Sequence, residues 1–305
     1  MAGYRQTSLQ TNLFIRAQIL QAIRGFFIDN DYLEVETPCR IAAPAPEAHI
    51  EAEVSKDWFL QTSPELCMKR LLAAGYPRIF QICKCFRKAE RGNKHLPELT
   101  MLEWYSVGHN YLEMMGQCEQ LLRYILQDLG SGESIAYQGE NIEFRSPWSR
   151  LAVSEAFEKY ASMPLREALL EDRFDEAMVA DLEPRLGRNP VFLYDYPACR
   201  GALARLKPEN PSLAERFELY IGGLELCNGF SELIDPLEQR ARFEKEQSFR
   251  QSLGRTTYPM PEKFLSALHD MPEAAGNALG IDRLVMLFAD TNKIDDVVAF
   301  TPEEL

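Results

Sequence analysis

The amino-acid sequence predicts an α+β fold in which helices flank an antiparallel sheet. Gly222-Gly223 joins two strand-like segments, 213–221 and 224–232, and a two-residue glycine loop is a strong β-hairpin signal. Residues 78–87 and 98–105 form a second pair of strand-like segments, which a charged loop separates. Several longer stretches carry apolar residues at helical spacing. Paired strands that neighbour each other in the sequence, combined with separate helices, are typical of an α+β domain.

The other elements follow from the same patterns. Residues 32–38 alternate in polarity and stop at a proline, which predicts a strand. Pro164 and Pro184 break a helical pattern between 151 and 186, and residues 276–289 indicate a glycine-containing strand or turn that leads into an apolar helix. The remaining predicted elements are helices at 12–30, 66–74, 112–129 and 237–254 and a strand at 191–196. Because there is no internal repeat or obvious linker, we expect one domain over residues 1–305.

Composition limits the class of protein. The chain has 33 basic and 46 acidic residues, a formal net charge of −13, which disfavours bulk nucleic-acid binding. No apolar run approaches the ~18 residues of a membrane span, and the N-terminus lacks the pattern of a signal peptide. The seven cysteines include no Cys-x-x-Cys pair, so neither a disulfide framework nor a zinc ribbon is expected. We expect a cytoplasmic protein without membrane contact.

The first candidate site lies on the strand pair 78–87 and 98–105. Strand alternation places Glu103 and Tyr105 on one face of the second strand, and Arg87 ends the first. An arginine suits a phosphate or a carboxylate, whereas a carboxylate beside a phenol suits an ammonium group. An arginine–glutamate pair at a sheet surface explains these residues equally well.

The second candidate site lies on the glycine hairpin. Glu218 and Glu225 fall on one face, about 7–8 Å apart if the turn has two residues. Two carboxylates this close suit Mg²⁺ bound to substrate phosphates, although two solvated glutamates remain the alternative. By strict alternation Asn228, Phe230 and Glu232 face the other way, so one shared pocket requires a bulge between Glu225 and Asn228.

The third candidate site begins at Gly276 and ends at Arg283. Glycines in this segment allow close approach of a ligand, and Arg283 near a helix N-terminus favours an anion. The three sites together closely resemble motifs 2 and 3 of the lysine branch of class II aminoacyl-tRNA synthetases. Residues 32–38 resemble motif 1, and residues 62–65 and 225–232 resemble that branch's amino-acid-binding segments. The resemblance runs from about residue 12 to about residue 300.

The resemblance is more specific still. The core begins almost at Met1, so no N-terminal anticodon-binding barrel is expected, and the chain resembles the stand-alone elongation factor P–lysine ligases. That family transfers (R)-β-lysine from its adenylate to a lysine side chain of elongation factor P. Ala278, where tRNA-charging enzymes usually have glycine, agrees with a substrate whose amino group has moved by one carbon.

The resemblance also implies roles. Arg87 and Arg283 would be catalytic, at the α-phosphate and the terminal phosphates of ATP, and Glu218 and Glu225 would hold Mg²⁺. Residues that would bind the amino acid are Ser63, Pro64, Glu65, Glu103, Tyr105, Asn228, Phe230, Glu232 and Ala278. Residues that would bind ATP are Arg87, Lys88, Ala89, His95, Leu96, Glu225, Leu226, Gly280 and Arg283.

Two positions depart from the family pattern, and they concern ATP. Ala89 stands where glutamate is frequent, and Glu90 replaces it only if the strand has already ended. Leu96 stands where asparagine is common. The resemblance further implies elongation factor P as acceptor and a homodimer, and makes tRNA an unexpected partner. Two alternatives stay open: a lysyl-tRNA synthetase core that obtains tRNA binding from another chain, and an inactive paralogue acting as a lysine sensor or scaffold.

Overall fold

The computed structural model describes residues 4–145, 147–201 and 203–305. Within these residues the main sheet has nine strands, in the order β1-β5-β6-β14-β13-β12-β10-β9, with β11 paired to β12. Neighbouring strands from β5 to β10 run antiparallel, and the two outer pairs, β1 with β5 and β9 with β10, are parallel. The strands of this sheet are β1 Leu33–Glu34, β5 Arg78–Phe86, β6 Glu98–Val107, β9 Ser149–Ala152, β10 Val191–Pro197, β11 Leu206–Lys207, β12 Asn210–Ile221, β13 Leu224–Ser231 and β14 Ala274–Gly280. The predicted α+β class is confirmed, while the sheet is antiparallel only in its centre.

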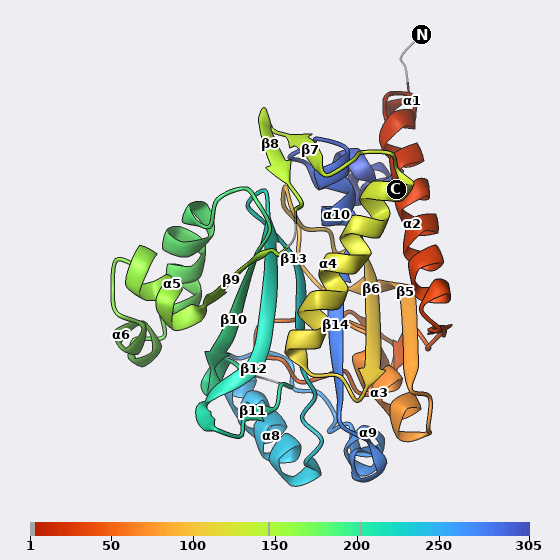
Figure 1. Ribbon diagram of the computed structural model, residues 1–305. Coiled ribbons are helices and arrows are strands. Elements are labelled where there is room, and N and C mark those ends of the chain that lie inside the picture. Colours follow the sequence, from red (N-terminus) through yellow and green to blue (C-terminus); the bar gives the residue numbers. More distant parts are fainter. Residues whose placement is uncertain (1–3, 146, 202) are drawn as a thin grey trace.

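Helices cover one face of the sheet. Figure 1 shows α4 (Tyr111–Asp128) crossing that face, with α2 (Gln10–Asp29) and α10 (Ile281–Phe288) beside it. The apolar side of these helices meets the side chains of alternate strand residues, such as Leu102 and Trp104 of β6, in one buried core. The Nε1–H of Trp104 donates to the side-chain carbonyl of Gln117 on α4 over 2.8 Å. The β6 residues that lie between these, such as Glu103, therefore point to the opposite face of the sheet.

Other helices lie on the opposite face and at the edges. The helix α3 (Glu65–Ala73) packs with α8 (Pro236–Ser252) and α9 (Glu262–Ala267) around a second apolar cluster. A third cluster joins β10 to α5 (Val153–Tyr160), α6 (Leu165–Leu170) and α7 (Phe174–Ala177). The smaller elements are α1 Arg5–Ser8, η1 Met178–Leu182, η2 Glu183–Arg185, η3 Ala198–Arg200, η4 Leu268–Asp270, η5 Ile294–Val297 and η6 Pro302–Glu304.

Most predicted elements are confirmed, but two regions differ. The strand predicted at 32–38 is reduced to β1, because only Leu33 and Glu34 are in register with β5, and the last contact is the N–H of Val35, which donates to the carbonyl oxygen of Phe80 (2.9 Å). Several short strands were not predicted from the sequence. A stretch of two to four residues is too short to show the alternation typical of a strand. They are β2 Arg40–Ile41, β3 Val54–Ser55, β4 Trp58–Leu60, β7 Ser134–Tyr137 and β8 Glu140–Glu143, together with β9 and β11 of the main sheet.

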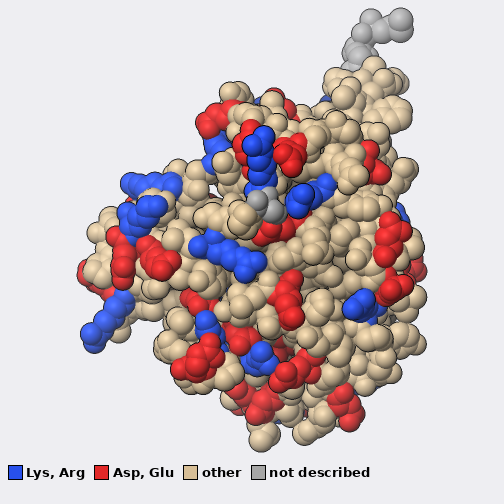
Figure 2. Space-filling model, viewed as in Figure 1, with Lys and Arg blue, Asp and Glu red and all other residues tan. Residues whose placement is uncertain are grey.

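The surface carries both signs of charge. On the face shown in Figure 2, acidic and basic side chains are interspersed and do not separate into two fields. Across the described part of the chain, no helix is both long and apolar enough to cross a membrane.

Candidate active site

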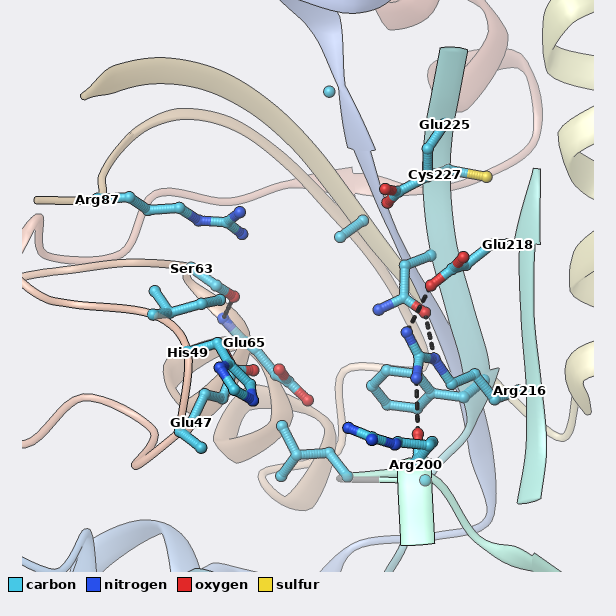
Figure 3. Close-up of a pocket in the computed structure, with 18 of the residues that line it drawn as sticks. Glu47, His49, Ser63, Glu65, Arg87, Arg200, Arg216, Glu218, Glu225 and Cys227 are labelled. Carbon is cyan, nitrogen blue, oxygen red and sulfur yellow. Dashed lines mark hydrogen bonds and ion pairs between the residues drawn. The ribbon is translucent and has the colours of Figure 1, made fainter. Parts of the chain in front are cut away.

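A cavity of about 1100 Å³ opens on the face of the sheet opposite α4. Strands β6, β12, β13 and β14 form its floor, and α3, α8 and the loop at residues 46–50 form its walls. Figure 3 shows Glu47, Ser63 and Glu65 on one wall and Arg216, Glu218 and Glu225 on the other. Segments that are far apart in the sequence therefore meet at one concave surface.

A carboxylate lies at the floor of the cavity. Glu103 faces it from β6, and its two oxygens accept hydrogen bonds from the hydroxyl groups of Ser63 (2.6 Å) and Tyr105 (2.8 Å). Only 1% of Glu103 is exposed. Burial, and then the nearby Glu65, raise the pKa of Glu103 to about 8. A buried carboxylate held by two donors is a natural partner for a cation that enters the cavity.

Two further carboxylates flank this position, and a lysine joins them. The side chain of Lys69 has no exposed surface, and its ammonium forms ion pairs with Glu65 and Glu232. Glu232 follows β13 and is 2% exposed, and burial raises its pKa to about 8 while Lys69 opposes the rise. Its Oε1 has no hydrogen-bond partner among the described residues. This unpaired oxygen lies next to Gly276, which lines the cavity.

Gly276 gives these groups their space. A Cβ atom at Gly276 would lie 2.3 Å from Tyr105 Cε1 and 2.5 Å from Glu232 Oε1. Real Cβ atoms do not approach other atoms this closely, so glycine is required where β14 crosses the carboxylate cluster.

The other end of the cavity is basic. Arg87 lines it just beyond β5, and its Nε is buried without a hydrogen-bond partner in the described chain. Arg283, in the first turn of α10, donates to the carbonyl oxygen of Glu225 (2.8 Å) and lies 2.6 Å from His95 Nε2. Burial, and then Arg283, lower the pKa of His95, which favours the neutral imidazole, the form that can accept from Arg283. Two arginines and a helix N-terminus favour a polyanion here.

The predicted bulge brings the hairpin acids into this basic end. In the β12–β13 register Tyr220 pairs with Glu225 and Leu219 with Cys227, so Leu226 is the extra residue. The bulge turns Glu225 and Asn228 to the same face, and both line the cavity with Glu218. The predicted two-residue turn at Gly222-Gly223 is confirmed as well, because Ile221 pairs with Leu224.

The hairpin carboxylates fit a divalent cation in part. Burial, and then the neighbouring Glu218 carboxylate, raise the pKa of Glu225. Glu218 already accepts from the hydroxyls of Tyr196 (2.6 Å) and Tyr220 (2.7 Å) and from Arg216 (2.6 Å). The described residues contain no cluster of three or more His, Cys, Asp or Glu side chains suited to a metal. Mg²⁺ usually takes only one or two carboxylates and completes its shell with phosphates and water.

Comparison with known proteins identifies the group to which this arrangement belongs. A profile of the class II tRNA synthetases (D, K and N) matches residues 1–304. An elongation factor P–(R)-β-lysine ligase of Haemophilus influenzae is 43% identical, covering 95% of this chain and 94% of that protein. The chain belongs to this family of class II synthetase-like ligases. Ligases of the same name from Pectobacterium carotovorum (40% identical, 99% and 98% covered) and Salmonella arizonae (37%, 98% and 98%) are also similar.

The structure brings most of the residues predicted for the ligase site together. Those that line the cavity are Ser63, Glu65, Arg87, His95, Leu96, Glu103, Tyr105, Glu218, Glu225, Leu226, Asn228, Phe230, Ala278, Gly280 and Arg283. Pro64, Lys88, Ala89 and Glu232 do not line it. Pro64 precedes α3 as its N-cap, Lys88 and Ala89 are exposed, and Glu232 lies behind the wall with Lys69.

The structure explains how the chain can do without a glutamate at position 89, where it has Ala89. The strand β5 ends at Phe86, and Ala89 has a φ of 61°, so the chain has left strand geometry before Glu90. Glu90 lines the cavity and lies 3.8 Å from Arg87. The condition for Glu90 to stand in for the missing glutamate is therefore met.

Several residues of the site were not predicted from the sequence. Arg216 donates to Asn228 Oδ1 (2.9 Å) and to Glu218, and its position two residues before Glu218 on β12 was a signal for a shared face. Glu47 lines the cavity from an irregular loop, where burial and Glu65 raise its pKa to about 7. Lys69 follows Glu65 by one helical turn, yet nothing in the sequence indicates that Glu232 is its second partner.

Proposed function

We propose that the chain activates (R)-β-lysine or lysine with ATP as an acyl-adenylate and transfers the acyl group to a lysine side chain of elongation factor P. One observation carries this proposal: a single cavity has buried carboxylates at one end and two arginines at the other. A diamino acid carries two cations and one carboxylate, and ATP supplies the polyanion. The names of the relatives support the acceptor.

The residues support a reaction by positioning and electrostatics. Glu65 and Glu103 would hold the ammonium groups, which aims the substrate carboxylate at the basic end where Arg87 lies. The carboxylate oxygen attacks the α-phosphorus, and the bond to pyrophosphate breaks. The acceptor amine then attacks the acyl carbon, AMP leaves, and the amine releases a proton. His95 and the charged Arg283 would contact the terminal phosphates.

Mg²⁺ belongs to the proposal as the usual cation of this chemistry. Glu225 and Glu218 would hold it, because both carboxylates line the cavity from neighbouring strands of one hairpin. When bound, the ion would neutralise the leaving pyrophosphate. Arg216 orients Glu218 from the side away from Glu225, since it pairs with Glu218 Oε1 and with Asn228.

The test is amino-acid-dependent pyrophosphate exchange with α-lysine and with each β-lysine enantiomer. We expect exchange with at least one isomer, and its loss in Arg87→Met. The matched control is Arg78→Met, at the far end of β5, which should keep activity. Addition of purified elongation factor P should give a protein one lysyl group heavier by mass spectrometry. Exchange without this adduct, but with charging of total tRNA, would favour a tRNA synthetase instead.

A homodimer is part of the proposal. Phe14 and Ile28 on α2 are 71% and 61% exposed, and Leu33 of the edge strand β1 is 49% exposed. Large apolar side chains exposed along α2 and on an edge strand suit an isologous interface. Light scattering should give twice the chain mass of 34.9 kDa, and Phe14→Glu with Ile28→Glu should give the monomer. A wild-type monomer would contradict this expectation.

A further inference from the structure

Lys69 lies directly behind the wall of the cavity at its acidic end. The helix α3 places Glu65 and Lys69 one turn apart, on the same helix face. The Lys69 ammonium reaches Glu65 from its own helix and Glu232 from the end of β13. One lysine therefore ties two carboxylates from separate elements into a single buried arrangement.

The surroundings keep Lys69 charged. Its Nζ lies 5.0 Å from the ring centroid of Phe230 and 6.0 Å from that of Phe264, within range of cation–π attraction. The two carboxylates raise the pKa of Lys69 against the effect of burial. The side chain has no exposed surface, so it cannot serve as a surface ion pair or contact an acceptor protein.

The charges at this end match a dication. Glu65, Glu103 and Glu232 carry three negative charges when ionised, and Lys69 reduces the total to two, the number of ammonium groups on lysine or β-lysine. Other titratable groups face the cluster as well: Tyr105 donates to Glu103, and Glu47 lies beside Glu65 with Arg87 opposing its charge. Without Lys69, Glu65 and Glu232 would repel each other.

We propose that Lys69 is a positioning residue for the amino-acid substrate: it fixes Glu65 and Glu232 in place and sets the net charge of the pocket for a diamino acid. Lys69 touches neither substrate nor ATP and acts through the two carboxylates. This inference rests on the proposed function, since it assigns a role within the same site.

The test compares Lys69→Met and Lys69→Arg with the wild type in pyrophosphate exchange across a range of pH. Lys69→Met should raise the KM for the amino acid by at least about tenfold and leave the KM for ATP within about twofold, because only the acidic end is altered. Without its cation Glu232 becomes harder to ionise, so the acid limb of kcat/KM should move up by about one pH unit or more. Lys69→Arg keeps the charge, so its acid limb should stay with the wild type even if the KM rises. Lys159→Met, on the exposed face of α5, is the matched control.

Each outcome decides between a functional and a merely structural lysine. A lower melting temperature of Lys69→Met with an unchanged amino-acid KM and an unchanged acid limb would overturn the inference. If Lys69→Met does not fold, Lys69→Met/Glu232→Gln removes both charges together, and it should fold with a raised amino-acid KM; a wild-type KM would overturn the role. A shifted acid limb in Lys69→Arg would do the same. Absence of exchange by the wild type with every lysine isomer would instead refute the proposed function.

Discussion

Raising the pH should tighten binding of the amino-acid substrate, because Glu103 must lose its proton before it can pair with an ammonium group. In the free protein its two oxygens accept from Ser63 and Tyr105, and burial raises its pKa to about 8. Both donors favour the ionised form, yet removal from water outweighs them. The positive charge of the bound substrate then stabilises the ionised Glu103 carboxylate.

The size of the effect follows from the pKa of Glu103. With a pKa of about 8, about one carboxyl in ten is ionised at pH 7, and apparent affinity falls with the fraction of the competent form. We therefore expect kcat/KM for the amino acid to rise at least about tenfold per pH unit below about pH 7, and more steeply where Glu232 must ionise as well, and to level off above about pH 8. Pyrophosphate exchange at saturating ATP measures this directly.

Substitution isolates Glu103 from other titrating groups. Glu103→Gln removes a buried charge-assisted contact and should raise the KM for the amino acid by about 30-fold or more, with the pH-dependent rise reduced. Glu98→Gln is the matched control on the same strand, since Glu98 is 55% exposed and pairs with Lys84 at the surface. A flat pH profile in the wild type, or kinetics of Glu103→Gln within about twofold of it, would show that the ammonium pocket lies elsewhere.

Three further outcomes are expected. Burial raises the pKa of Glu47, Glu103 and Glu232 to about 7, 8 and 8, above their values in the unfolded chain. The free energy of unfolding should therefore fall as the pH rises from about 5 to about 8. Thermal melts measure this, and a melting temperature that rises over this range would contradict it. Glu225→Gln should increase the Mg²⁺ concentration needed for half-maximal exchange by at least about tenfold, because mutation of even an outer-shell partner lowers metal affinity by that much. The amino-acid KM should stay unchanged. Gly276→Ala should raise the amino-acid KM by at least about tenfold, because the new methyl group would lie 2.5 Å from a Glu232 oxygen; wild-type kinetics would show that the cluster can relax.

The local elements and much of the site can be predicted from residue patterns. Strand alternation put Glu103 and Tyr105 on one face, and the glycine hairpin with its required bulge put Glu225 and Asn228 on another. These inferences succeed because strand periodicity and turn geometry depend on neighbouring residues alone. The resemblance to the class II lysine branch then indicated that the separate faces meet.

How those faces are joined is visible only in the folded protein. It places Glu232 behind the cavity wall, gives it Lys69 as a partner across 163 positions of sequence, and brings Glu47 to Glu65 from an irregular loop. It also reduces the predicted first strand to Leu33 and Glu34. Ion pairs between distant elements and the pairing of edge strands depend on packing in three dimensions, and local periodicity carries no information about it.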